Sequence, residues 1–82
     1  MRINATIEMV PNKRAAIVEC HDQHGEWKGS ILVESPIRSW SLAPNTPSGP
    51  GQDRAAIYEI AYDRASQNAA AHGGTLNTIR WA

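Results

Sequence analysis

The sequence predicts an α+β fold in which a three- to five-stranded, mainly antiparallel sheet packs on one helix, in the order β-β-β-(β)-α-β. Residues 2–10 alternate between apolar and polar side chains, which is typical of a half-buried strand. Residues 54–72 contain neither proline nor glycine and are rich in alanine, which favours a helix of about five turns. Residues 75–82 alternate again and add a final strand after the helix.

The first three strands are expected to form an antiparallel meander. A turn at residues 11–13, where proline fixes φ and asparagine tolerates a left-handed backbone, returns the chain along residues 14–21. A second turn at residues 22–25 ends in glycine and leads into a third strand over residues 27–34. Alternation along this third strand predicts one shared face for four residues: Trp27, Gly29, Ile31 and Val33.

The region between the third strand and the helix is expected to be mostly irregular. Pro36 ends the strand, yet residues 37–42 are expected to resume as a short edge strand that contains Trp40. Residues 43–52 are rich in proline and glycine and predict a loop. Asp53 is expected to be the helix N-cap, and the glycines after residue 72 are expected to stop the helix. A helical crossover permits the last strand to pair in parallel with an earlier one.

The helix is expected to lie on one face of the sheet. Its apolar stripe at helical spacing comprises Ile57, Tyr58, Ala61, Tyr62, Ala65 and Ala69. We expect Ile57, Ala61 and Ala65 to make the contact, and the sheet residues opposite to be Ile3, Ile7, Val18 and Ile31. The second strand carries apolar side chains on both faces, with Ile17 pointing away from Val18, so the pattern alone does not fix its register.

Length, charge and cysteine content limit the classes of protein that the chain can represent. Its 82 residues predict a single domain over residues 1–82. Eight basic and eight acidic residues cancel, which removes the general attraction to nucleic acid or anionic membranes. The N-terminus does not resemble a signal peptide and no apolar run reaches the length of a membrane span, so no membrane is expected. With Cys20 as its single cysteine, the chain is expected to be cytoplasmic.

No catalytic, cofactor or metal signature is found in the sequence. The candidate metal ligands are Cys20, His21, Asp22 and His24. Adjacent strand residues such as Cys20 and His21 point to opposite faces, which argues against a shared ion and against a cysteine-histidine nucleophile. Glu59 and Asp63 lie one turn apart on the polar face of the helix, where solvated carboxylates are usual. We therefore expect no enzyme activity, no cofactor and no metal.

The tryptophans are the most suggestive residues. The chain has three Trp and no Phe, and tryptophan is enriched at binding hot spots because it combines a large apolar surface with a polar N–H group. Trp40 lies between two serines beside the proline-rich loop, where we expect an exposed sheet edge. The predicted partner-binding residues are Trp40, Arg38, Trp27 and Trp81.

These observations predict a small non-catalytic protein-binding module, such as a phage or mobile-element inhibitor or adaptor. The alanine-rich, phenylalanine-free composition suggests a bacterial or phage origin. The alternative is a nucleic-acid-binding domain that uses the open sheet face with its Trp, Arg and Lys residues. A basic patch on that face would favour the alternative, whereas ionisable groups converging in a pocket would favour an enzyme. The identity of the partner protein and the formation of a homodimer stay open.

Overall fold

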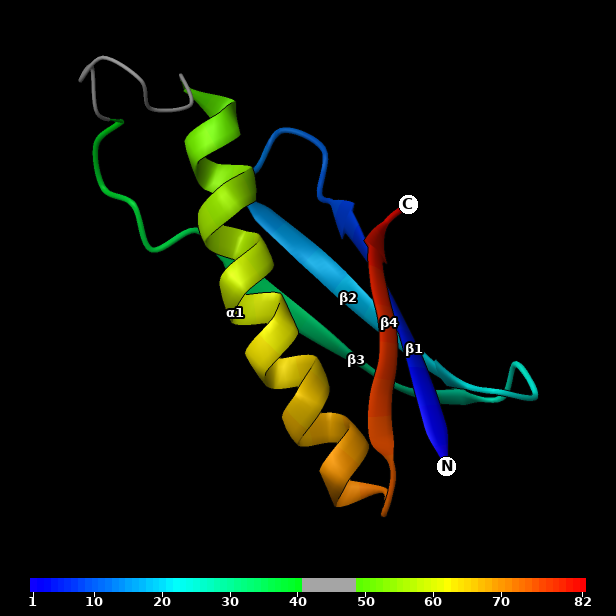
Figure 1. The fold of residues 1–82 in the computed structure, drawn as a ribbon. Helices are drawn as coiled ribbons and strands as arrows, with labels where there is room; N and C mark the ends of the chain where they lie inside the picture. The colour runs from blue at the N-terminus through cyan, green and yellow to red at the C-terminus, as the bar shows by residue number, and fades with distance from the viewer. Residues whose placement is uncertain (41–48) are drawn as a thin grey trace.

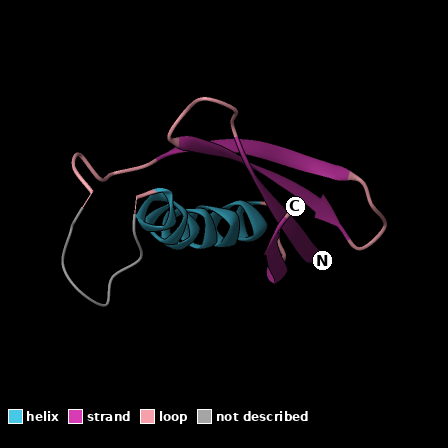
Figure 2. Cartoon of the chain, turned by 90° about the horizontal axis from the view of Figure 1, so that it is seen from above, coloured by secondary structure: helices cyan, strands magenta, loops and turns pink. Residues whose placement is uncertain are grey.

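The computed structural model describes residues 1–40 and 49–82, and it contains one sheet and one helix. The elements are β1 (Arg2–Met9), β2 (Ala15–Asp22), β3 (Trp27–Glu34), α1 (Pro50–Ala71) and β4 (Thr75–Trp81). The sheet has the strand order β3-β2-β1-β4, and α1 lies across one of its faces (Figures 1 and 2). Pairing is antiparallel between β1 and β2 and between β2 and β3, and parallel between β1 and β4. The predicted α+β fold is confirmed.

The core lies between α1 and the sheet, as predicted. Residues Ile57, Ala61, Ala65 and Ala69 repeat every fourth position along α1 and are fully buried. Ile3, Ile7 and Val18 are buried opposite them, and Ile31 is partly buried against the same cluster. Small alanine side chains let the helix backbone approach the sheet closely. The stripe is narrower than expected, because Tyr58 and Tyr62 are 36% and 52% exposed.

The last strand uses the parallel pairing that a helical crossover permits. Leu76 pairs with Ile3, but the next pair joins Thr78 to Asn4, so Asn77 is an extra residue in β4. This bulge interrupts the predicted alternation of the strand. As a result Leu76 and Ile79 both pack against the core although they are three positions apart.

The start of the helix corrects two predictions. The helix begins at Pro50, so residues 50–52 are helical and not part of a loop. Gly49 is the N-cap, and Asp53 lies in the first turn without capping it. Proline suits the first helical position because its missing N–H would have no partner there. The rest of the predicted loop, residues 43–48, lies outside the described residues.

The optional fourth strand before the helix is not seen where the structure describes the chain. Residues 37–40 form no strand, and residues 41 and 42 lie outside the described residues. Within the described ranges, no helix combines the length and the hydropathy that crossing a membrane requires.

Candidate functional site

The two faces of the sheet differ, because α1 lies on one side of it only (Figure 2). Trp27 is on the other side, which corrects the predicted face of this residue. Cys20 pairs with Gly29, but His21 pairs with Trp27, so Lys28 is an extra residue in β3. This bulge reverses the alternation, and the Trp27 side chain emerges on the uncovered face, where it is 59% exposed.

Three large apolar side chains are exposed on this uncovered face. Ile17 on β2 pairs directly with Leu32 on β3, and the two are 39% and 56% exposed. The Trp27 Nε1–H donates a hydrogen bond to Glu19 Oε2 at 2.8 Å, which fixes the indole beside the Glu19 carboxylate. We call Ile17, Leu32 and Trp27, together with the carboxylates of Glu8 and Glu19, the open-face patch. Exposed apolar side chains rimmed by polar groups often mark interaction sites.

A cavity of about 200 Å³ adjoins the open-face patch and shares Glu8, Ile17 and Glu19 with it. It is lined by Thr6, Glu8, Met9, Val10, Pro11, Ile17 and Glu19. The register brings these residues together, because Glu8 pairs with Ile17 and Thr6 pairs with Glu19. The cavity therefore combines apolar walls with two carboxylates from neighbouring strands.

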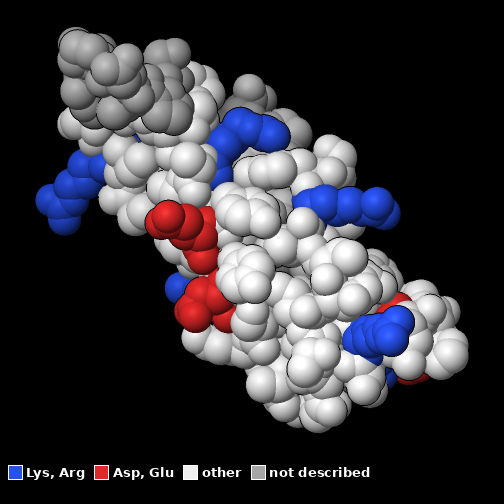
Figure 3. Space-filling model, in the orientation of Figure 1, with Lys and Arg blue, Asp and Glu red and all other residues white. Residues whose placement is uncertain are grey.

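Glutamate side chains and Arg80 lie on different strands of the uncovered face. Glu8, Glu19 and Glu34 lie on the strands β1, β2 and β3. Thr6 on β1 pairs with Glu19 on one side and with Arg80 of β4 on the other. The positive charge of Arg80 therefore lies toward the β4 edge of the sheet. The opposite side of the molecule, which carries α1 and β4 in Figure 3, also has its Lys and Arg side chains scattered. The side seen in Figure 3 shows no continuous basic patch of the kind that a nucleic acid would require.

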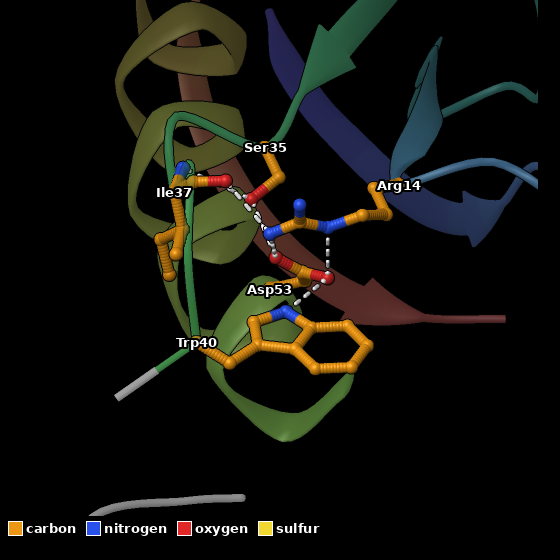
Figure 4. A network of polar contacts seen from close by, with 5 residues as sticks. All are labelled: Arg14, Ser35, Ile37, Trp40 and Asp53. Carbon is orange, nitrogen blue, oxygen red and sulfur yellow. Dashed lines mark hydrogen bonds and ion pairs between the residues drawn. The ribbon is translucent and has the colours of Figure 1, made fainter. Parts of the chain in front are cut away.

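Trp40 belongs to a different region, at the N-terminal end of α1. The Asp53 carboxylate lies there between the Arg14 guanidinium and the Trp40 indole, with Ser35 beside it (Figure 4). Arg14 donates from Nε to Asp53 Oδ2 at 2.8 Å and from Nη2 to Asp53 Oδ1 at 2.7 Å. Ser35 Oγ donates to Asp53 Oδ1 at 2.7 Å, and Trp40 Nε1 donates to Asp53 Oδ2 at 3.0 Å. We call these four residues the Asp53 cluster.

The Asp53 cluster joins segments that are distant in the sequence. Asp53 itself is only 2% exposed. The hydrogen bonds from Arg14 are the largest cause that lowers the pKa of its carboxyl well below the usual range, and burial opposes them only in part. Arg14 Nη2 also donates to the Ile37 carbonyl at 2.7 Å, which holds the segment after β3. The cluster therefore ties the start of β2 and the segment after β3 to the first turn of α1.

This cluster gives Trp40 a structural role that its serine neighbours do not indicate. The indole is 44% exposed, but its N–H binds a buried carboxylate and its ring lies 5.1 Å from the Arg14 guanidinium carbon. Trp40 also lines a second cavity, of about 360 Å³, together with the basic residues Lys13, Arg14 and Arg54. Its role in partner binding stays a prediction.

The other two predicted site residues also lie away from the open-face patch. Trp81 pairs with Ile7 and is partly buried against the core, with the Arg54 guanidinium carbon 4.0 Å from its ring centroid. Arg38 is exposed in the segment after β3. The structure thus separates Trp27 from Trp40, Arg38 and Trp81. Ile17, Leu32, Glu8 and Glu19 were missed, although the apolar side chains on both faces of the second strand were a signal for Ile17.

The predicted metal-ligand candidates have separate roles. Cys20 is buried in the core, where burial raises the pKa of its thiol. Asp22 Oδ1 accepts hydrogen bonds from the backbone N–H groups of His24 and Glu26, and the bond from Glu26 is the largest cause that lowers the pKa of its carboxyl. Among the residues that the structure describes, no group of three or more His, Cys, Asp or Glu side chains could hold a metal ion.

Comparisons with protein families, curated proteins and solved structures find no match for this chain. The open-face patch offers apolar area and carboxylates, whereas the Asp53 cluster uses its polar groups to hold the fold together.

Proposed function

We propose that this protein is a non-catalytic protein-binding module whose contact surface is the open-face patch. The observation that carries the proposal is the exposure of Ile17, Leu32 and Trp27 on a face that no described element covers. Fully burying an exposed Ile or Leu side chain is worth about 1.5 to 3 kcal/mol, and these side chains, which are 39% to 59% exposed, can gain part of that on binding. Trp27 is the expected hot spot, because tryptophan dominates many interfaces and its indole is already fixed by Glu19.

The charges of the patch indicate the chemistry of its partner. Glu8 and Glu19 flank the apolar side chains, so a complementary surface would present apolar groups together with Lys or Arg. A second copy of the chain, docked patch against patch, would bring these carboxylates close to their own copies. That repulsion favours a different protein as the partner. Such a module acts by occupying a surface of that protein, as an inhibitor or adaptor does.

The same charges distinguish this proposal from nucleic-acid binding through the open face. Glu8, Glu19 and Glu34 would repel phosphates that approach β1, β2 and β3. Basic residues gather instead around the cavity beside Trp40, which shares Met9 with the cavity of the open-face patch but is lined by none of the five patch residues. The acidic character of the patch therefore supports a protein partner.

The proposal is tested by comparing what immobilised wild type and variants retain from a bacterial lysate. The patch variants are Trp27→Ala and Leu32→Ser, and the matched control is Tyr62→Ala, which removes an aromatic ring of similar exposure from α1. A true partner should be retained by the wild type and the control and lost from both patch variants. With the purified partner, Trp27→Ala should weaken binding by about 2 kcal/mol, or roughly 30-fold.

Two outcomes would contradict the proposal. Retention of the same proteins by wild type and both patch variants would show that the patch is not the contact surface. Retention that disappears after nuclease treatment of the lysate would show that nucleic acid, and not a protein, is the ligand.

A further inference from the structure

The cavity that adjoins the open-face patch has the size and lining of a site for one side chain. Its volume of about 200 Å³ is below the range of roughly 300 to 1,000 Å³ that is usual for small-molecule and cofactor pockets. Val10, Pro11 and Ile17 supply apolar walls. A small cavity that is lined by both apolar and charged groups suits a long side chain that has an apolar stem and a charged end.

The charged groups of the cavity are both acidic. Glu8 on β1 and Glu19 on β2 are diagonal neighbours across the strand pair, because Glu8 pairs with Ile17 and Thr6 pairs with Glu19. Diagonal neighbours lie roughly 7 to 8 Å apart, with their β-carbons somewhat closer, so two long side chains in this relation can reach the same ligand. The hydrogen bond from Trp27 Nε1 engages one of the two carboxylate oxygens of Glu19, Oε2.

The ion pairs among the described residues do not neutralise these two carboxylates. Within the described residues, the salt bridges involve Asp53, Asp22 and Glu26, and none involves Glu8 or Glu19. Arg80 on β4 pairs with Thr6 of β1 and is the basic residue in the same cross-strand row as Glu19. Among the described residues it forms no ion pair with Glu8 or Glu19. The cavity therefore presents two acidic groups to a ligand that approaches from the open face.

We propose that this cavity binds one lysine or arginine side chain of the partner protein. The aliphatic stem lies against Val10, Pro11 and Ile17, and the charged end lies between Glu8 and Glu19. This inference rests on the proposed function, because the basic side chain comes from the protein that docks on the open-face patch. It adds a specificity requirement to that contact, since a partner without a basic residue at this position leaves two carboxylates facing an unmatched surface.

The cavity is tested with small probes that mimic the two side chains. The isotopically labelled full chain is titrated with n-butylguanidinium and n-butylammonium, and with n-butylurea as a neutral probe of similar shape. The cations should shift the backbone amide signals of residues 8–10 and 17–19, and the neutral probe should not. The double variant Glu8→Gln and Glu19→Gln should weaken binding of the cations by about tenfold. Glu59→Gln, on the exposed side of α1, is the matched control and should leave it unchanged.

Arg80 provides a test in the opposite direction. Arg80→Gln removes a positive charge near the cavity without touching its lining, so binding of both cationic probes should become tighter. Equal shifts with the neutral probe, or unchanged cation binding in the Glu8 and Glu19 double variant, would overturn the inference.

Binding of the purified partner to the variants distinguishes a failure of this inference from a failure of the proposed function. If the purified partner is lost from Trp27→Ala but binds the Glu8 and Glu19 double variant like the wild type, the cavity inference fails and the proposed function stands. If the cationic probes bind as expected but no protein is captured through the patch, the proposed function fails while the cation preference of the cavity stands.

Discussion

Replacing Asp53 by asparagine is expected to destabilise the fold more than any other change of a carboxylate to its amide. The Asp53 carboxylate accepts four side-chain hydrogen bonds, from Arg14 Nε, Arg14 Nη2, Ser35 Oγ and Trp40 Nε1. Asparagine keeps one oxygen acceptor but turns an NH₂ group toward donors at the other position. The substitution also leaves the Arg14 guanidinium without its counter-charge.

The magnitude follows from the burial of the two partners. Breaking a fully buried ion pair costs about 3 to 5 kcal/mol. The Asp53 side chain is 3% exposed but the Arg14 side chain is 43% exposed, so water recovers part of the loss. We therefore expect Asp53→Asn to lower the free energy of unfolding by about 2 to 3 kcal/mol. For a domain of this size, that corresponds to a fall in Tm of roughly 10 to 20 °C.

Thermal and urea unfolding, followed by circular dichroism, measure this loss. The matched control is Asp63→Asn, because Asp63 is an exposed carboxylate of the same helix that accepts a hydrogen bond from Gln67. The control should stay within about 0.5 kcal/mol of the wild type. If Asp53→Asn also stays within that margin, the Asp53 cluster does not hold α1 to the strands.

Three further predictions concern stability. Ala61→Leu should overpack the contact between α1 and the sheet and lower the free energy of unfolding by about 1 to 3 kcal/mol, whereas Ala70→Leu on the exposed side of α1 should not. An unchanged Tm for Ala61→Leu would mean that the buried helix face is wrongly assigned. Trp40→Phe keeps the ring but removes the N–H donor, so it should cost about 1 kcal/mol and leave partner affinity unchanged; weaker binding at unchanged stability would instead make Trp40 a binding residue. Because the pKa of Asp53 is lowered in the fold, the stabilisation from its charge is present above about pH 4 and is lost as the pH falls below that value. Acid titration of Tm should therefore be less steep in Asp53→Asn, and equal slopes would contradict that assignment.

The fold could be predicted because its signals are local. Alternation along residues 2–10 and the alanine-rich stretch that contains Ala61 indicate a strand and a helix without knowledge of any distant contact. The start of the helix could not be predicted, because proline and glycine are loop residues in most contexts. Only the structure shows that Pro50 and Gly51 form the first turn of α1.

The candidate site was harder to predict because it depends on register. A single extra residue at Lys28 moves Trp27 from the helix side to the open face, and alternation alone cannot reveal such a bulge. Glu8 and Glu19 become neighbours only through the pairing of β1 with β2. Arg14 and Asp53 are separated by 39 positions, so nothing local in the sequence indicates their ion pair or the role that it gives Trp40.

The partner should contact the open-face patch and not the region around Trp40. The chain has three tryptophans, so its labelled form should show three indole N–H signals, one each from Trp27, Trp40 and Trp81. Addition of the purified partner should shift the Trp27 indole signal strongly, because that indole lies on the open face beside Glu19, and should leave the Trp40 and Trp81 signals in place. A shift confined to Trp40 or Trp81, with the Trp27 signal unmoved, would contradict the claim and move the contact surface to the N-terminal end of α1.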